Sequence, residues 1–161
     1  MADYWLSNED RLRILTTYQR IAMVGLSANQ YRPSHFAAIY MLAQGYRIIP
    51  VNPQNAGEKI LGQTVYASLQ DVPEPIEIVD IFRKPEDVPP IVDAAIEIGA
   101  KVIWMQLGVI NHEAAEKAKR AGLEVVMDRC VKIEHGRFFG GLSTVGINSR
   151  VVGSRLRTTK Y

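Results

Sequence analysis

Five short apolar runs separated by segments of a different character constrain the fold of this chain more than any other feature. The runs occupy residues 21–25, 47–53, 76–82, 101–106 and 123–127. Each run is continuously apolar instead of alternating with polar residues, which is typical of strands that are buried on both faces. The intervening segments are long enough to cross back over a sheet. The sequence therefore predicts an α/β protein with a mainly parallel sheet.

Helix signals fill most of the gaps between these runs. Helices are expected over residues 8–20, 34–45, 86–98 and 111–122. Ser7 and Ser34 are the expected N-caps of the first two helices, and Gly45 is a good stop for the second. Within the second helix, helical spacing joins Phe36, Ile39, Tyr40 and Ala43. With right-handed crossovers, this order predicts a Rossmann-like, doubly wound sheet of five or more strands, with residues 21–24 and 78–81 near its centre.

Composition places the chain among ordinary globular proteins. Its 161 residues are 47% hydrophobic and 22% charged, which suggests one domain with a sizeable core. No apolar run approaches the roughly 18 to 20 residues of a membrane span, and the N-terminus does not resemble a secretory signal. The single cysteine, Cys130, allows no internal disulfide. We therefore expect a cytoplasmic protein.

The charge of the chain is unevenly distributed. Of the 19 basic residues, five fall in residues 137–161, where there is no acidic residue. The first 136 residues hold the other 14 basic residues and all 17 acidic ones. We expect a domain over residues 1–136 and a basic, glycine-containing arm over 137–161. Because the arm lacks interleaved basic and aromatic residues, nucleic acid is not its expected partner.

Polar and glycine residues collect where the predicted strands end. The groups are Gly25-Leu26-Ser27, Val51-Asn52-Pro53, Phe82-Arg83-Lys84, Gln106-Leu107-Gly108 and Asp128-Arg129-Cys130. In an open parallel sheet, ligands bind beyond the carboxyl ends of the strands, at the switch in strand order. These groups are therefore the candidate site.

The loop after the first strand has features of an anion site. Gly25 lets a ligand phosphate approach the backbone, and the following helix offers N–H groups and the positive end of its dipole. Ser27, Asn29 and Gln30 add neutral donors, and Arg32 adds a charge. An ordinary strand-to-helix turn is the alternative interpretation.

The ends of the second and third strands help to define the ligand. A dinucleotide site usually has an Asp or Glu after the second strand, whereas this chain has Asn52 and Pro53. Arg47 lies at the start of that strand, where it points away from a 2′-phosphate. Arg83 and Lys84 follow Phe82, and two cations beside an aromatic ring suit a phosphorylated nucleoside. Two solvated cations in a loop are the alternative.

Catalytic groups are scarce. Cys130 and His135 lie in an expected loop, where a thiolate–imidazole pair is one interpretation and an inert, packed cysteine is the other. His35 and His112 lie near helix starts, and the three histidines show no metal-ligand spacing. Asp128 is expected to fix a loop. We therefore assign no catalytic or metal-ligating residue.

Six blocks, in this order, resemble a known family. They are VGLS, VNP, GEKILGQTVYASLQDVP, VDIFRKPEDVP, GAKVIWMQLGV and VVMDRC. Over about residues 18–135 the chain resembles the small stand-alone CoA-binding proteins, which are similar to the N-terminal domain of the succinyl-CoA synthetase alpha subunit. The resemblance implies that CoA phosphates lie against Ser27, Ala28, Asn29 and Gln30. It also implies contacts from Asn52, Pro53, Gln106, Leu107 and Gly108, although the synthetases usually have a carboxylate where Gln106 stands.

The resemblance implies binding without ligation. The synthetase uses a second domain with a phosphorylated histidine and a partner subunit, and this sequence offers neither. We expect a single-domain module that binds coenzyme A or an acyl-CoA, such as a sensor or carrier. The alternative is an enzyme, either a small NADP-dependent reductase or a thiol-transfer enzyme that uses Cys130. Whether the chain forms a homo-oligomer stays open.

Overall fold

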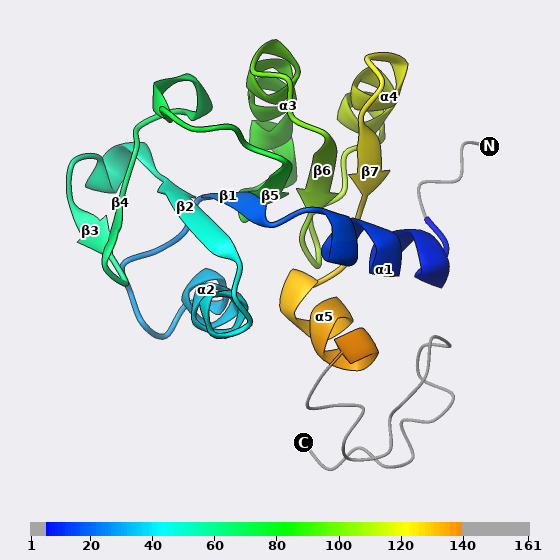
Figure 1. The fold of residues 1–161 in the computed structure, drawn as a ribbon. Helices are drawn as coiled ribbons and strands as arrows, with labels where there is room; N and C mark the ends of the chain where they lie inside the picture. The colour runs from blue at the N-terminus through cyan, green and yellow to red at the C-terminus, as the bar shows by residue number, and fades with distance from the viewer. Residues whose placement is uncertain (1–5, 140–161) are drawn as a thin grey trace.

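The structure, a computed structural model, describes residues 6–139, and these form a parallel five-stranded sheet with helices on both faces (Figure 1). The strands are β1 (Arg20–Val24), β2 (Arg47–Val51), β5 (Ile78–Ile81), β6 (Val102–Met105) and β7 (Glu124–Val126). Their order is β2-β1-β5-β6-β7, and every pairing is parallel. The predicted fold class is confirmed, and so is the central position of β1 and β5.

Strand order reverses between β1 and β5. From β1 the chain moves outward to β2, and it then returns to place β5 on the other side of β1. The connections that leave β1 and β5 therefore diverge at the carboxyl edge, and a crevice opens between them. This crevice is where the candidate site lies.

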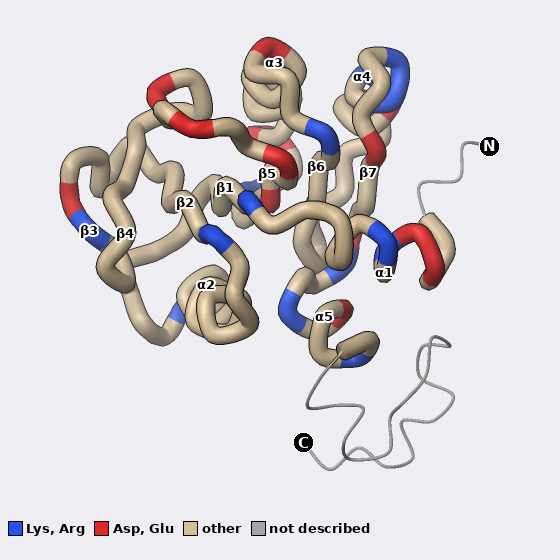
Figure 2. Tube along the Cα trace, viewed as in Figure 1, with Lys and Arg blue, Asp and Glu red and all other residues tan. Residues whose placement is uncertain are grey.

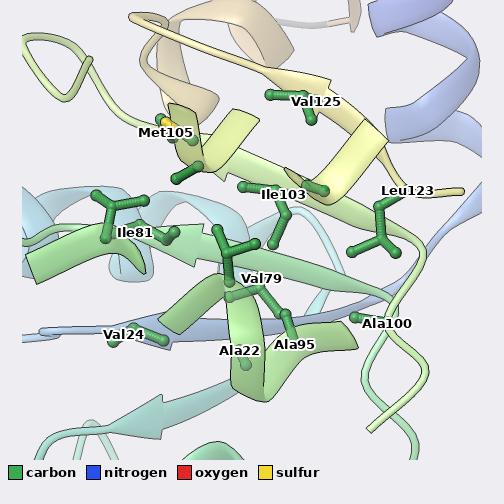
Figure 3. Close-up of a cluster of buried hydrophobic side chains, with 14 of the residues drawn as sticks. Ala22, Val24, Val79, Ile81, Ala95, Ala100, Ile103, Met105, Leu123 and Val125 are labelled. Carbon is green, nitrogen blue, oxygen red and sulfur yellow. The ribbon is translucent and has the colours of Figure 1, made fainter. Parts of the chain in front are cut away.

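Two helices cover one face of the sheet with an entirely apolar layer. They are α3 (Val88–Glu97) and α4 (His112–Arg120), and the short 3-10 helix η2 (Leu69–Asp71) packs beside α3. Figure 3 shows strand residues such as Val79 and Ile103 packed together with Ala95 of α3. The two prolines of α3 lie in its first turn, where the N–H that proline lacks has no partner within the helix.

The opposite face carries α1 (Asn8–Thr17), α2 (Pro33–Ala43) and α5 (Val131–Phe139). On α2 the buried residues include Ala37, Ala38 and Met41. The apolar spacing of Phe36 and Ile39 does not mark the buried face, since both side chains are about half exposed. The small alanines explain the difference, because they let the helix lie close to the sheet.

The structure corrects two predicted helix ends. Ser34 is not the N-cap of α2, because Arg32 holds the cap position and Pro33 opens the helix. The first helix is capped by Ser7 as predicted, but it ends at Thr17 instead of continuing to residue 20. The extended pairing of β1 with β2 begins at Arg20 and takes those residues out of the helix.

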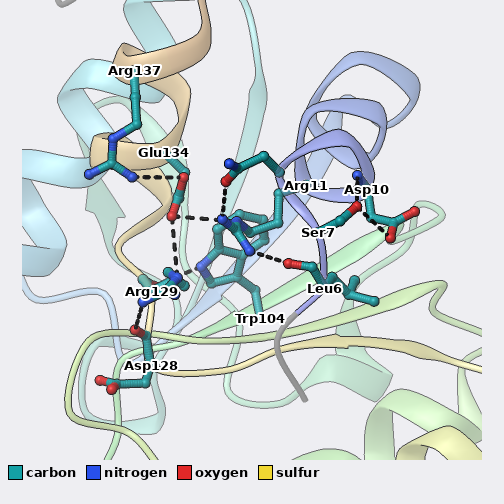
Figure 4. Close-up of polar contacts among 10 residues, drawn as sticks. Leu6, Ser7, Asp10, Arg11, Trp104, Asp128, Arg129, Glu134 and Arg137 are labelled. Carbon is teal, nitrogen blue, oxygen red and sulfur yellow. Dashed lines mark hydrogen bonds and ion pairs between the residues drawn. The ribbon is translucent and has the colours of Figure 1, made fainter. Parts of the chain in front are cut away.

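The helix α5 was not predicted. It occupies Val131–Phe139, where the sequence suggested a loop. Figure 4 shows how Glu134 of α5 receives ion pairs from Arg11 of α1 and from Arg129 and Arg137, at nitrogen–oxygen distances of 3.5, 3.5 and 3.3 Å. These contacts attach α5 to α1. Residues 140–161 of the expected arm lie outside the described residues.

Short elements fill the remaining connections. The long connection after β2 contains η1 (Pro53–Asn55) and a small hairpin of β3 (Lys59–Ile60) and β4 (Gln63–Thr64). Thr64 ends β4, and Tyr66 forms an isolated parallel bridge with Val51. The 3-10 helix η3 (Pro85–Asp87) leads into α3. It holds Asp87 at the mouth of the crevice.

Candidate functional site

A polar pocket of about 620 Å³ lies at the carboxyl edge of the sheet. Of the predicted site residues, it is lined by Gly25, Ser27, Arg32, Asn52, Phe82, Arg83, Lys84, Gln106 and Leu107. The lining also includes residues that were not predicted, namely Pro33, Ser34, Gln54, Asp87 and Val109. The structure thus brings together residues from the ends of four strands. Their role in binding CoA stays a prediction.

A second pocket of about 360 Å³ adjoins the first. Its walls are mostly apolar and include Val24, Val51, Leu69, Ile91 and Ala94. The predicted residue Pro53 lies here, and Arg83 and Asp87 line both pockets. Sequence reasoning missed this pocket because η2 and α3 supply much of it. The sequence signal that could have indicated this pocket is the block GEKILGQTVYASLQDVP, because residues 67–70 within it line the wall.

Gly25 is required by the chain's own packing. Its φ is +92°, and a Cβ atom at this position would lie 2.5 Å from the carbonyl oxygen of Phe82 and 2.8 Å from Cδ of Arg83. Both distances are shorter than side-chain carbons tolerate. The close approach that we attributed to a ligand phosphate is therefore made by the backbone after β5. Substitution of Gly25 would disturb the protein before it could report on a ligand.

The first residues of α2 fix the backbone of the first loop. The Ser27 N–H donates to Oγ of Ser34 at 3.0 Å, and Nδ1 of His35 lies 2.9 Å from the Ser27 carbonyl oxygen. Both α2 side chains are buried. His35, near the start of this helix, is thus part of the support of the first loop.

The first loop also folds on its own side chains. Oγ of Ser27 accepts from the Asn29 N–H at 3.0 Å, and Oδ1 of Asn29 accepts from the Tyr31 N–H at 2.9 Å. In the part of the chain that the structure describes, the N–H groups of Ala28 and Gln30 have no partner. Ala28, Asn29 and Gln30 are exposed and lie outside the pocket lining. The donors that they can offer a ligand are the backbone N–H groups at 28 and 30 and the side-chain amides of Asn29 and Gln30.

Asn52 joins the end of β2 to the first loop. Its side chain is buried, and Nδ2 donates to the carbonyl oxygen of Leu26 at 3.1 Å. Its Oδ1 accepts from the Gln54 N–H at 3.0 Å. With both ends of the amide occupied, Asn52 holds two walls of the pocket together. An Asp in this position would lose the donor to Leu26.

Cations dominate the charge of the pocket. Arg32, Arg83 and Lys84 line it, and Asp87 is its acidic residue, with Oδ2 3.5 Å from a guanidinium nitrogen of Arg83. Arg47 is the first residue of β2, at the opposite edge of the sheet, and is paired with Glu74 at 2.8 Å. Figure 2 shows how the Lys and Arg positions are distributed over the described elements. The position of Arg47 agrees with the expectation that it points away from the site. The pocket therefore favours an anion.

A buried carboxyl group lies beneath the floor of the pocket. Gln106 is buried, and its Nε2 lies 2.6 Å from Oδ1 of Asp80 on β5. Asp80 is fully buried, and this burial raises its pKa to about 8. Sequence reasoning passed over Asp80 because it lies within an otherwise apolar run.

The end of β6 is held by Asp128. The Gly108 N–H donates to Oδ1 of Asp128 at 2.7 Å, which agrees with the expected loop-fixing role of that residue. Gly108 itself does not line the pocket, whereas its neighbour Leu107 lines it and is largely exposed. The predicted wall of residues 106–108 is therefore formed by its first two members.

The candidate thiol chemistry receives no support. Cys130 is half buried, and this burial raises the pKa of its thiol. Nδ1 of His135 lies 3.0 Å from the Tyr40 hydroxyl, and its ring stacks on Phe139. None of the contacts described for His135 involves Cys130. Within residues 6–139, no group of three or more His, Cys, Asp or Glu side chains is placed to hold a metal ion.

The fold and this pocket define a Rossmann-like domain with a cationic cleft at its switch point. Residues 19–136 match the family described as CoA binding domain, and the chain belongs to that family. Among curated proteins, it is 41% identical over 122 residues to the uncharacterized protein YneT of Bacillus subtilis. The aligned residues make up 76% of this chain and 89% of YneT.

Several solved structures share the fold of this chain. A hypothetical protein from Pyrococcus horikoshii OT3 is 42% identical, with a TM-score of 0.82 over 87% of this chain and all of the other. A Thermus thermophilus protein is 34% identical, with a TM-score of 0.80 over 83% of this chain and all of the other. An acetyl-coenzyme A synthetase of Ca. Korarchaeum cryptofilum shares the fold at 20% identity and a TM-score of 0.63, over 73% of this chain and 28% of the enzyme. No described helix is long and apolar enough to cross a membrane.

Proposed function

We propose that this chain binds coenzyme A or an acyl-CoA in the two pockets at the carboxyl edge of its sheet, as a module without catalysis of its own. One observation carries the proposal. A cationic pocket and an apolar pocket adjoin each other, and Arg83 lines both. A ligand that suits them combines several negative charges with an apolar or aromatic group. Coenzyme A has this combination, and membership of the CoA binding domain family supports the assignment.

The two pockets suit different parts of the ligand. Arg32, Arg83 and Lys84 offer charge to the pyrophosphate and ribose phosphate, and the N–H groups at 28 and 30 can add hydrogen bonds at the entrance. The apolar pocket beside Leu69 and Ile91 suits the adenine ring. Arg83 lies at the junction and can contact either part. We therefore expect it to contribute more to affinity than the other cations.

The enzyme alternatives lack a supporting observation. The position where a dinucleotide site has a carboxylate for the ribose holds Asn52, whose amide bonds to Leu26 and Gln54. Arg47 is paired with Glu74. A buried thiol with a raised pKa is a poor nucleophile at neutral pH. These features argue against an NADP-dependent reductase and against thiol transfer through Cys130.

Replacement of Arg83 tests the proposal. Arg83→Ala should raise the dissociation constant for CoA by roughly tenfold to a hundredfold, because it removes one charge-assisted contact at a half-exposed position. Arg20→Ala is the matched control, since Arg20 is an exposed cation at the other end of β1. Isothermal titration calorimetry of the three proteins with CoA measures both effects.

The results separate the proposal from its alternatives. Equal losses in Arg83→Ala and Arg20→Ala would mean that overall charge, not the pocket, attracts CoA. A thermal-shift panel of CoA, acetyl-CoA, NADPH and ATP adds a second measurement, because a ligand of the folded state raises the midpoint. Stabilisation by NADPH alone would replace the CoA proposal with the reductase.

A further inference from the structure

Asp80 and Gln106 form a polar pair beneath the pocket. Gln106 lines the pocket, whereas Asp80 lies below it on β5 and is fully buried. The hydrogen bond that the described residues give Asp80 is the one to Gln106, and its second oxygen, Oδ2, is buried without a partner among them. A carboxylate in such a place is poorly compensated, so the neutral acid is favoured.

Within residues 6–139, burial and the hydrogen bond with Gln106 are the influences on the charge of Asp80. Its neighbours in the sheet are Met23 of β1 and Trp104 of β6. From the side of α5, the titratable group that interacts with it is the thiol of Cys130. On the nearby helices, Glu134 pairs with Arg11, and His35 lies against Ser27. The protonation of Asp80 therefore depends mainly on its burial and on Gln106.

The two forms of Asp80 favour opposite orientations of the Gln106 amide. The ionised carboxylate accepts from Nε2, so Oε1 is the amide atom left for the pocket. The neutral acid can donate its proton to Oε1, and a half-turn of the amide then presents the N–H groups of Nε2 to the pocket. Since the pocket is lined by three cations, its ligand brings acceptor oxygens. Those oxygens bind well only when Gln106 presents donors.

We propose that Asp80 is a positioning residue that sets the orientation of Gln106 through its proton, so that binding of CoA at this pocket takes up a proton from solvent. The proposal rests on the proposed function and adds to it a regulation of the same site by pH. Because burial raises the pKa of Asp80 to about 8, the equilibrium lies in an accessible range. The affinity for CoA should therefore fall by about tenfold between about pH 7 and pH 9.

Asp80→Asn is the decisive variant. The Asn amide has the shape of the acid and can always donate to Gln106, so it imitates the neutral form. Calorimetric titration with CoA, at about pH 9 in two buffers that differ in ionisation enthalpy, counts the protons taken up. We expect uptake approaching one proton per CoA in the wild-type protein, and none beyond the ligand's own in Asp80→Asn. The variant should also lose the pH dependence of the affinity.

Gln106→Leu provides a second, independent test. Without the amide, the protonation of Asp80 cannot change which hydrogen-bonding group faces the ligand. CoA should therefore bind more weakly and without the extra proton uptake. This variant decides the question if Asp80→Asn does not fold. If wild-type protein binds CoA with the same uptake as both variants, the role of Asp80 is refuted while the proposed function stands. If it binds no CoA at any pH, the proposed function itself fails.

Discussion

The two faces of the sheet differ sharply in what they bury. The layer beneath α3 and α4 is a continuous cluster of aliphatic side chains and methionines. The layer toward α1, α2 and α5 also has an apolar cluster. The buried polar side chains of residues 6–139 lie in this layer or next to it. These are Arg11, Ser34, His35, Asn52, Asp80, Gln106, Glu134, His135 and Arg137.

The difference is visible within a single strand. Val79 and Ile81 of β5 point into the aliphatic cluster, whereas Asp80 between them points the other way, toward Gln106. One face thus holds the sheet together by apolar burial alone. The other face uses part of its interior for hydrogen bonds that lead up to the carboxyl edge. The comparison predicts that introducing a carboxylate destabilises the aliphatic face, whereas removing one destabilises the polar face.

The largest effect is expected when an acid is moved to the aliphatic face. Val79→Asp places a carboxylate within the buried aliphatic cluster, and it should lower the free energy of unfolding by on the order of 5 kcal/mol. Val79→Ala, which only removes methyl groups, should cost about 2 kcal/mol. Urea unfolding measures both. Equal midpoints for the two variants would show that this face tolerates charge.

The next effect comes from breaking the charge cluster on the polar face. Glu134→Ala leaves Arg11 and Arg137 buried without their carboxylate, and the free energy of unfolding should fall by about 3 to 5 kcal/mol. Arg13→Ala removes an exposed ion pair with Glu124 and should cost less than about 1 kcal/mol. Should the two variants unfold at similar urea concentrations, the cluster does not hold α5 to α1.

The aliphatic face was the more predictable of the two. Continuous apolar runs indicated the five strands, and the segments expected at 86–98 and 111–122 correspond to α3 and α4, because these signals are local in the sequence. The polar face was predicted less well. The helix α5 was missed because its stability comes from distant partners, since Glu134 pairs with Arg11 more than 100 residues earlier. Spacing on α2 suggested the wrong buried face for a similar reason, because contact with the sheet selected the alanines.

The candidate site shows the same contrast between features with a local sequence signal and features that depend on distant contacts. Residues at strand ends, such as Ser27, Asn52 and Gln106, were predictable to lie together because parallel strands end at one edge. The supporting contacts were not predictable. That Ser34 holds Ser27, and that Asp80 lies under Gln106, depends on distances across elements that no local pattern encodes. The apolar pocket beside Leu69 depends on where η2 packs on α3.

A smaller, pH-dependent effect should distinguish Asp80 from the acids at the surface. Its pKa is raised from an unfolded value of about 4 to about 8, so between these values the folded protein holds a proton that the unfolded chain releases. This contribution to stability is complete at low pH and is lost as the pH rises toward 8. The free energy of unfolding of the wild-type protein, relative to Asp80→Asn, should therefore fall by about 1.4 kcal/mol per pH unit between about pH 5 and pH 7.

Denaturant unfolding of both proteins at several pH values measures this difference. A matched control is Asp93→Asn, which changes an exposed acid on α3 and should give a nearly flat difference. If the difference between wild type and Asp80→Asn is equally flat, Asp80 is ionised in the folded protein and the two faces are less distinct than their burial suggests.

The smallest effect is expected at Cys130, which lies where the polar face meets the start of α5. Burial and the nearby Asp80 both raise the pKa of its thiol, so the neutral thiol predominates at neutral pH. Cys130→Ser replaces it with a hydroxyl of similar size and should change the dissociation constant for CoA by less than about twofold. Calorimetric titration measures the affinity, and the rate of alkylation by iodoacetamide measures the thiol, which should react more slowly than free cysteine. Alkylation as fast as free cysteine, together with a thiol-transfer activity that Cys130→Ser abolishes, would make this face catalytic and would overturn the binding-module proposal.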